Sequence, residues 1–370
     1  MLRVLIHPAS VTGLGALLIA VLMALYPGQA LASAARGLSI WWEVLFPALF
    51  PFFVLSELLL GFGIVHFFGR ILDPLMRPLF RLPGIGGFVV TMGYVSGYPV
   101  GARLTAQLWE QKLVNRAEGE RLVAFTTTSD PIFLIGAVSV GFFHNVALAP
   151  LLAAAHYGGA FLLGLLMRFH DPHAPASEGV RGRLITPPPH ADGVSGTGAL
   201  AGSRRRSRLY EAIKAMHEAR LLDGRGLGKL LQDSIQSALR LMMVVGGLVV
   251  FFSVVMEMLT RVGFVEGLAE VVRLVFGIFG LPGQLGDAAV FGLFEVTLGA
   301  RAAGEAGTGL MHQAAIAAWV LSWGGLSVHA QVASLLSRTD LRYKPLLIAR
   351  LVHAFLAMAL VYVLWGWLAP

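Results

Sequence analysis

Long apolar stretches separated by short polar connections dominate the pattern of this 370-residue chain. A membrane-spanning helix needs about 20 mainly apolar residues. Five stretches reach that length with few charges, at residues 11–32, 41–62, 146–168, 236–260 and 345–368. The pattern therefore predicts an all-α, polytopic membrane protein.

Four further apolar stretches are interrupted by Gly, Pro, Ser, Thr and isolated ionisable residues. They lie at residues 84–101, 119–143, 285–300 and 313–336. Backbone N–H and C=O groups freed by such breaks cannot face lipid, because unsatisfied polar groups are costly there. We expect these discontinuous helices to line a cavity or to pack inside the bundle.

The pattern also divides the chain into four parts. Residues 1–36 hold an N-terminal transmembrane helix, residues 37–168 and 234–370 form two apolar halves, and residues 169–233 form a polar linker. The N-terminal part also resembles a signal peptide, because Ala32-Ser33-Ala34 follows its apolar run like a cleavage site.

The linker is rich in Arg, Pro and Gly, including Pro187-Pro188-Pro189 and Arg204-Arg205-Arg206-Ser207-Arg208. Cytoplasmic loops carry an excess of Lys and Arg, so we expect the linker on the cytoplasmic side. We interpret the Arg run as an anchor near anionic lipid. A surface helix is expected at residues 207–223.

The two halves resemble each other, which predicts an internal duplication. Leu82-Pro83-Gly84 recurs as Leu281-Pro282-Gly283, and Gly101-Ala102-Arg103 recurs as Gly299-Ala300-Arg301 at nearly the same spacing. Further matches pair Glu57 with Glu257, Gly63 with Gly263, and Gly93 with Gly292. Repeats with discontinuous helices are typical of transporters, whose substrate site lies at the repeat interface. Inverted and parallel repeats both fit the pattern.

Composition supports the membrane interpretation. Hydrophobic residues make up 56% of the chain, charged residues 13%, and the mean hydropathy is +0.73. These values exclude a disordered chain, a coiled coil and a disulfide scaffold. The formal charge of +7 indicates membrane orientation, and no nucleic-acid partner is expected. With no cysteine there is no thiolate nucleophile and no cysteine-metal site.

Several motifs together resemble those of the sporulation integral membrane proteins with nucleoside-recognition, or Gate, domains. They are Leu49-Phe50-Pro51-Phe52-Phe53-Val54, Ser56-Glu57-Leu58-Leu59, Met92-Gly93-Tyr94-Val95-Ser96-Gly97-Tyr98-Pro99-Val100-Gly101-Ala102, Glu118-Gly119-Glu120-Arg121-Leu122, Gly292-Leu293-Phe294-Glu295-Val296-Thr297-Leu298-Gly299 and Gly324-Gly325-Leu326-Ser327-Val328-His329-Ala330-Gln331. The resemblance implies two Gate repeats that form a substrate path in an endospore-forming bacterium. It also implies transport of dipicolinate, a small aromatic dicarboxylate. Ser129-Asp130-Pro131 stands where the family is expected to read Ser-Gly-Pro, so a carboxylate replaces a glycine.

Arg103 and Arg301 end two of the broken segments. Beside inward-pointing helix N-termini, a guanidinium would hold a carboxylate through charge-assisted hydrogen bonds. Alternatively, both arginines anchor re-entrant turns on the cytoplasmic side. Asp130 and Glu295 are candidates for substrate contact or proton coupling, because ionised groups in apolar sequence are costly. For Glu57 and Glu257 we favour a structural role, capping a broken neighbour.

Hydroxyl, amide and imidazole groups near the breaks complete the predicted site, although hydroxyls there also satisfy freed backbone groups. Trp323 fits either ring stacking or a membrane interface. The residues predicted to contact substrate are Ser96, Tyr98, Arg103, Thr128, Ser129, Asp130, Glu295, Thr297, Arg301, Ser327, His329 and Gln331.

The sequence thus predicts a cell-membrane transporter of a small anion, dipicolinate or a related aromatic carboxylate, acting during endospore formation. The outer forespore membrane is one expected location, and other sporulation membrane proteins are expected partners. The alternatives are a nucleoside transporter and a scaffold without transport activity. Neither a metal nor a cofactor is expected, since His329 lacks a partner at metal-ligand spacing. The chain lacks a P-loop, His-Glu-x-x-His and Gly-x-Ser-x-Gly, so we do not expect an enzyme.

Overall fold

The computed structural model describes residues 8–177 and 207–370, which form helices and no strands. The first half comprises α2 (Pro8–Leu25), α3 (Pro27–Ser39), η1 (Ile40–Leu45), α4 (Phe46–Gly61), α5 (Ile64–Phe80), α6 (Gly86–Ser96), α7 (Tyr98–Glu110), α8 (Arg116–Thr126), η2 (Phe133–Phe142), η3 (Val146–Leu148) and α9 (Ala149–Met167). The rest comprises α11 (Arg208–Asp223), α12 (Leu227–Arg261), α13 (Phe264–Ile278), η4 (Gly283–Leu285), α14 (Gly286–Phe294), α15 (Val296–Glu305), α16 (Leu310–Trp323), α17 (Gly325–Leu336) and α18 (Tyr343–Leu368).

Several of these helices are suited to cross a membrane. In the described part of the chain, Val146–Met167, α12 and α18 are each long and apolar enough, and two bent helix pairs raise the number of spans to five if each pair is one span. The largest apolar core gathers around α9, α16 and α18, where Leu151, Val320 and Ala354 are fully buried. The prediction of an all-α, multi-pass membrane protein is confirmed.

The first expected span, residues 11–32, differs from a single straight helix. The axis of Gly13–Leu25 meets that of Pro27–Glu43 at 107°. Pro27 lies in the first turn of α3, where its missing N–H is tolerated, but it cannot continue the helix before it. The proline therefore explains why α2 ends at Leu25.

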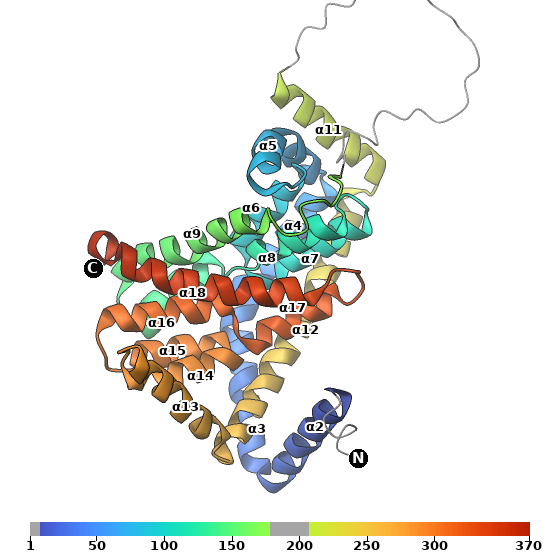
Figure 1. Cartoon of the computed structure of the whole chain (residues 1–370). Coiled ribbons are helices and arrows are strands. Elements are labelled where there is room, and N and C mark those ends of the chain that lie inside the picture. Colours follow the sequence, from blue (N-terminus) through green and yellow to red (C-terminus); the bar gives the residue numbers. More distant parts are fainter. Residues whose placement is uncertain (1–7, 178–206) are drawn as a thin grey trace, which may run out of the picture.

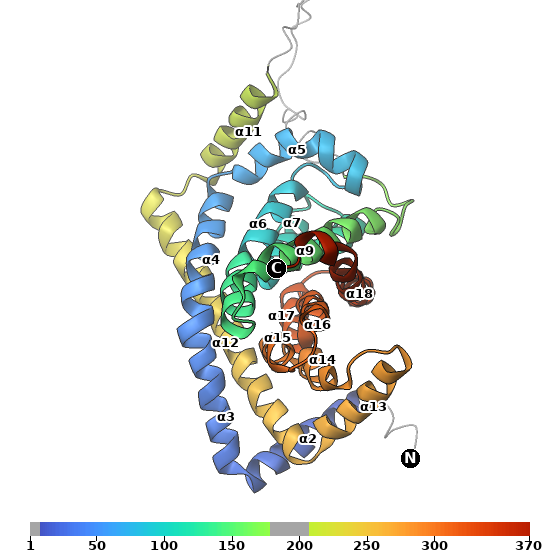
Figure 2. The same cartoon turned by 90° about the vertical axis from the view of Figure 1, so that its left-hand side faces the viewer.

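The long helices form two pairs. α12 packs along α3 and α4, with α5 and α11 at one end of this pair and α13 at the other (Figure 2). α9 and α18 also pack side by side (Figure 1). They are antiparallel, because Asp171, just after α9, lies 3.9 Å from Arg342, just before α18. Among the broken helices, α6 packs on α4, α17 packs on α7 and α12, and α16 packs on α18.

The two halves share an order of elements. A long helix, a left-handed glycine and an amphipathic helix occur as α4, Gly63 and α5 and again as α12, Gly263 and α13, with φ of 76° at Gly63 and 73° at Gly263. In Figure 2, α4 leads to the upper end of the molecule, whereas α12 leads to the lower end. The duplication predicted from the sequence stays a prediction.

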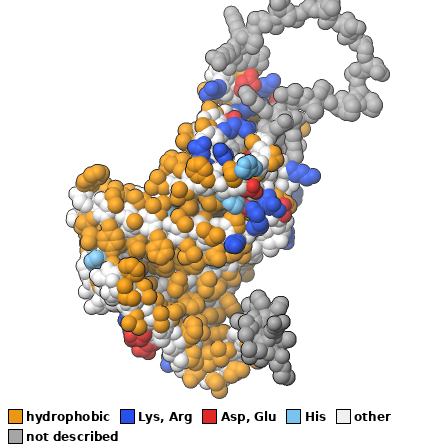
Figure 3. Space-filling model, in the orientation of Figure 1, with side chains coloured by type: hydrophobic (Ala, Val, Ile, Leu, Met, Phe, Trp, Pro, Cys, Tyr) orange, Lys and Arg blue, Asp and Glu red, His pale blue; other side chains and the backbone are white. Residues whose placement is uncertain are grey.

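Charge is distributed unevenly over the surface. On the face in Figure 3, Lys and Arg gather towards the end that carries α5, α11 and the start of α18, while hydrophobic side chains cover most of the remainder. This is the distribution expected of a membrane protein with one basic, cytoplasmic side. The surface helix expected at 207–223 corresponds to α11. Pro187-Pro188-Pro189 and Arg204 to Arg206, which the sequence analysis singled out, lie outside the described residues.

Candidate functional site

The first helix break lies at Gly97, between α6 and α7. Its φ of 87° and ψ of −175° belong to a region that is essentially restricted to glycine. A Cβ on Gly97 would lie 3.2 Å from Oδ2 of Asp130. The close approach brings the first break into contact with the second.

The second break, Thr127 to Asp130, joins α8 to the helical turn before η2. Asp130 is 7% exposed, and its Oδ1 accepts a hydrogen bond from the backbone N–H of Phe133 at 2.8 Å. The hydroxyl of Thr127 donates to the carbonyl of Val123, and that of Thr128 donates to the carbonyl of Gly93. Asp130 thus caps the helix that follows, and both hydroxyls satisfy backbone groups.

The second half repeats this juxtaposition of a carboxylate and a glycine. Glu295 separates α14 from α15, and its Oε2 accepts from the backbone N–H of Leu298 at 2.8 Å. Gly324 and Gly325, with φ of 86° and 74°, separate α16 from α17. A Cβ on Gly325 would lie 2.9 Å from the backbone N of Glu295. In each half, a break with a carboxylate cap therefore packs against a break at glycine.

Arg350, on α18, joins the breaks of the two halves. The side chain is 1% exposed, and it donates to the carbonyl of Thr127 at the end of α8 and, at 3.3 Å, to that of Trp323 at the end of α16. The ring of Tyr98 lies 6.0 Å from the guanidinium, and its hydroxyl donates to the carbonyl of Leu321 at 2.8 Å. A cation is favourable at these helix C-termini, where carbonyls lack intrahelical partners.

Two fully buried histidines extend this network. The backbone N–H of Ser129 donates to Nε2 of His156 at 2.9 Å, so the proton of this imidazole is assigned to Nδ1, which lies 2.8 Å from Oγ of Ser322. Nε2 of His353 lies 2.8 Å from the carbonyl of His156, and its Nδ1 lies 3.2 Å from Arg350. Through these side chains, α9 and α18 are hydrogen-bonded to the break that follows α8 and to the end of α16.

Sequence reasoning missed Arg350, His156 and His353. His156 lies inside the apolar span at residues 146–168, and Arg350 and His353 lie together inside the span at residues 345–368. That position is itself a signal, because such residues are costly in a membrane and usually face the interior of the bundle.

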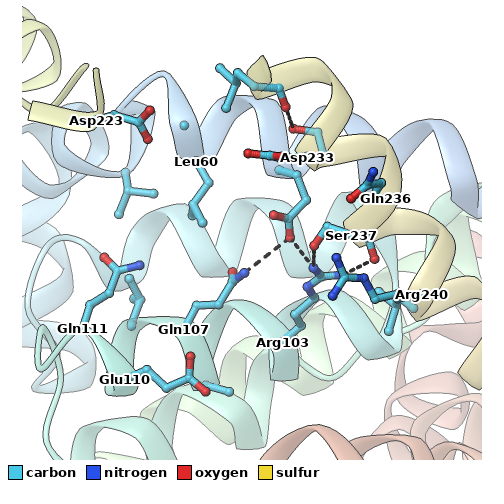
Figure 4. Close-up of a pocket in the computed structure, with 18 of the residues that line it drawn as sticks. Leu60, Arg103, Gln107, Glu110, Gln111, Asp223, Asp233, Gln236, Ser237 and Arg240 are labelled. Carbon is cyan, nitrogen blue, oxygen red and sulfur yellow. Dashed lines mark hydrogen bonds and ion pairs between the residues drawn. The ribbon is translucent and has the colours of Figure 1, made fainter. Parts of the chain in front are cut away.

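A polar cavity of about 810 Å³ lies near the other ends of α7 and α17. It is lined from both halves of the chain, by α4, α5 and α7 and by α11, α12 and α17. Figure 4 shows Arg103 projecting from α7 towards Ser237 and Arg240 on α12, with Gln107 beside it on the same helix. The cavity also contains Arg225 and Arg338.

Arg103 already has partners in this cavity. Its guanidinium lies 2.7 Å from Oε1 of Glu57 and donates to the hydroxyl of Ser237 (Figure 4). Glu57 also accepts from Gln107 at 3.4 Å. Glu57 thus forms an ion pair rather than the expected helix cap, and Glu257 likewise pairs with Arg36 and Arg261. An anion that reaches Arg103 would compete with Glu57.

The structure separates the predicted residues into three groups. Those at the breaks are Ser96, Tyr98, Thr128, Ser129, Asp130 and Glu295, with Thr297 in the first turn of α15 and Ser327, His329 and Gln331 on α17. Arg103 lies in the cavity. Arg301 is 60% exposed and pairs with Glu305 at 2.9 Å, so the two predicted arginines share no partner among the described residues. Their joint role in substrate binding stays a prediction.

A charged cluster ties α8 to α18 at the start of the linker. Glu120 has a fully buried side chain that accepts from Nε and Nη2 of Arg342, both at 2.8 Å, and lies 2.6 Å from Nε2 of His170. Burial raises the pKa of Glu120, but the hydrogen bonds from Arg342 and His170 outweigh it, so the pKa lies below its ordinary value. The carboxylate stays ionised and holds this end of the bundle together.

Groups of three or more His, Cys, Asp or Glu residues that could hold a metal ion do not occur among the described residues. The described site therefore consists of guanidinium, carboxylate, hydroxyl, amide and imidazole groups. Such groups can bind a polar or anionic solute without a metal.

Comparisons with known proteins extend these observations. The family described as Gate, nucleoside recognition, matches residues 42–161. The sporulation integral membrane protein YlbJ of Bacillus subtilis is 42% identical over 340 residues, which cover 92% of this chain and 78% of that protein. An uncharacterised protein of Alkalihalophilus pseudofirmus is 29% identical over 109 residues, covering 27% of this chain and 24% of that protein. No solved structure matches the chain.

The family resemblance inferred from the sequence motifs is thereby confirmed. The chain shares a high identity with YlbJ over most of its length, and its first half carries the Gate domain. It belongs to the family of sporulation integral membrane proteins that includes YlbJ of Bacillus subtilis.

Proposed function

We propose that this protein carries a small anion, dipicolinate or a related aromatic carboxylate, across a membrane during endospore formation. The observation that carries the proposal is the cavity of about 810 Å³ between the two halves, which contains Arg103, Arg225, Arg240 and Arg338. Its volume falls in the range of pockets for small molecules. Arginine is suited to carboxylates because its planar fork can donate two parallel hydrogen bonds.

The arrangement of the helices supports a carrier rather than an enzyme or a static scaffold. Broken helices lie at comparable positions in both halves, and α4 and α12 lead to opposite ends of the molecule (Figure 2). Transporters with inverted repeats bind their solutes beside such breaks. We place the protein in the outer forespore membrane as part of the same proposal, with other sporulation membrane proteins as its partners.

A nucleoside carrier is the second candidate. The amides of Gln107, Gln111 and Gln236 line the cavity together with the carboxylates of Glu57 and Asp233. Amide and carboxylate groups suit the hydroxyl and N–H groups of a nucleoside, and the Gate family is described by nucleoside recognition.

Uptake into proteoliposomes that contain the full-length protein distinguishes the candidates. We expect saturable uptake of radiolabelled dipicolinate that exceeds the uptake of adenosine and uridine at equal concentration. Uptake of nucleosides without uptake of dipicolinate would support the second candidate instead.

A scaffold makes a different prediction, because it would require the linker and not the cavity. Deleting residues 177–205 should leave most dipicolinate uptake intact in a carrier. A scaffold would be identified by two results together. A variant whose cavity no longer supports transport would sporulate normally, and the variant that lacks residues 177–205 would fail to sporulate.

A further inference from the structure

Arg350 is a buried cation whose described partners do not include a carboxylate. The side chain is 1% exposed, and it contacts the carbonyls of Thr127, Trp323 and Leu321 and a ring nitrogen of His353. Buried charges are normally paired with an opposite charge. In residues 8–177 and 207–370, only neutral groups compensate Arg350, so the guanidinium can still accept an anion.

A narrow void beside Arg350 contains a second group suited to an anion. Arg350, His329, Trp323 and Thr127 line this void, which is too narrow for a water molecule, and its apolar wall is formed by Val328, Val332 and Leu346. His329 is only 6% exposed, and within the described residues its Nε2 has no partner with good hydrogen-bond geometry, although the backbone of Trp323 lies close to the imidazole.

The partner of the other ring nitrogen indicates what Nε2 can do. Nδ1 of His329 is hydrogen-bonded to the hydroxyl of Tyr343. When that hydroxyl donates, the imidazole proton resides on Nε2, which is then a buried donor without an acceptor. The ring of Trp323 lies beside this imidazole, with centroids 4.2 Å apart. The void therefore combines a guanidinium, a free N–H donor and a large aromatic ring.

We propose that a carboxylate of the transported solute binds between the Arg350 guanidinium and Nε2 of His329, with the aromatic ring of the solute against Trp323. This inference rests on the proposed function and deepens it by naming the internal binding site. A carboxylate supplies the negative charge that Arg350 lacks and the acceptor that His329 lacks. The void is too narrow here even for a water molecule, so the helices around it must move apart before a solute can enter.

α17 connects this void with the polar cavity. Val332 lines the void, whereas Ser334 and Leu335, less than one helical turn further along, line the cavity. The left-handed glycine Gly324 precedes the helix and the left-handed Gly325 begins it, and such a junction can act as a hinge. A small displacement of α17 would open the void towards the cavity that contains Arg103.

Binding of dipicolinate to the purified full-length protein in detergent tests the site, measured by isothermal titration calorimetry. His329→Leu removes the donor and should weaken binding by about tenfold or more, the usual effect of losing a hydrogen bond to a charged group. His329→Gln should retain most of the affinity, because its amide can place an N–H near the position of Nε2. Arg350→Lys should weaken binding while keeping a positive charge.

His312→Leu is the matched control. Nδ1 of His312 lies 2.9 Å from the hydroxyl of Tyr362 on α18, so it forms the same type of pair as His329 and Tyr343, but it lines neither the void nor the cavity. The His312→Leu variant should bind dipicolinate with the same affinity as the wild type. Thermal unfolding identifies variants that do not fold, and His329→Ala replaces His329→Leu if the latter is unstable.

Each outcome bears on one proposal or on both. Equal affinity in wild type and His329→Leu overturns the internal site but leaves the proposed function standing if dipicolinate is transported. An equal loss in His329→Leu and His312→Leu also overturns it, because the effect would then be structural. If the wild type neither binds nor transports dipicolinate, both proposals fail.

Discussion

Asp130 packs directly against Gly97, so that a Cβ atom on Gly97 would lie 3.2 Å from Oδ2 and 3.3 Å from Cβ of Asp130. The two residues belong to successive helix breaks, between α6 and α7 and between α8 and η2. Because their backbones approach so closely, a change in one break must affect the other.

Gly97→Ala should destabilise the protein by about 1–3 kcal/mol, because alanine does not readily adopt a φ of 87° with a ψ of −175°. Thermal unfolding of the purified variants in detergent measures the effect. Gly158→Ala on α9 is the control, since an added Cβ there meets no atom within 4 Å. Its stability should stay unchanged or rise by a few tenths of a kcal/mol. Equal destabilisation by both substitutions would contradict the prediction.

Asp130→Ala should cost about 0.5–2 kcal/mol of stability through loss of the cap on Phe133, while Asp130→Asn should be nearly neutral. Asparagine keeps an acceptor at the same position but removes the charge. Chemical denaturation in detergent compares the two variants. If Asp130→Asn were as destabilising as Asp130→Ala, the charge of Asp130 and not its hydrogen bond would be the important contribution.

Arg103→Ala should reduce dipicolinate uptake by about tenfold, because it removes charge-assisted hydrogen bonding from the cavity. Arg301→Ala should have a smaller effect, since Arg301 is 60% exposed and pairs only with Glu305 among the described residues. Proteoliposome uptake at matched protein content measures both. A comparable loss in Arg301→Ala would instead support the paired-arginine site predicted from the sequence.

Glu120→Gln should lower stability at pH 7, with an effect that depends on pH. The pKa of Glu120 is depressed below 4.5 in the folded protein, so the unfolded chain takes up a proton first as the pH falls. The contribution of this carboxylate is fully present above about pH 4.5 and is lost as the pH falls through the depressed value. The difference in stability between the wild type and the Glu120→Gln variant should therefore become smaller below pH 4.5.

Unfolding temperatures measured between pH 7 and pH 3.5 test this expectation. Glu305→Gln provides the control, because Glu305 is 61% exposed and its ion pair with Arg301 should contribute less than about 1 kcal/mol. If the difference in unfolding temperature between wild type and Glu120→Gln grew as the pH fell, Glu120 would not be a stabilising ionised carboxylate.

The helices and their interruptions followed from local sequence. The stretch around Gly97-Tyr98-Pro99 predicted a break, and α6 ends at Ser96. The matching glycines Gly63 and Gly263 each precede an amphipathic helix, α5 and α13. These features depend on backbone conformations and apolar runs that neighbouring residues determine.

The site was harder to infer. Arg103 and Arg301 occupy equivalent positions in two similar motifs, yet Arg103 lies in a cavity with Glu57 and Arg301 is exposed. Similar local sequence places both at the same point of a helix, but the surroundings of each helix decide whether its side chain is buried. Those surroundings come from α4 and α12 around Arg103, which the motif does not encode.

The sequence by itself determined that this is a multi-pass helical membrane protein with interrupted helices, because hydropathy and chain-breaking residues act over short distances. Only the tertiary structure decided that Arg350 binds the carbonyl of Thr127, 223 residues away, and that His329 retains an unpaired nitrogen beside it. The physical reason is that a buried charge takes whichever partners packing brings near it. These partners are backbone carbonyls at helix ends, and their positions depend on how α8, α16 and α18 assemble.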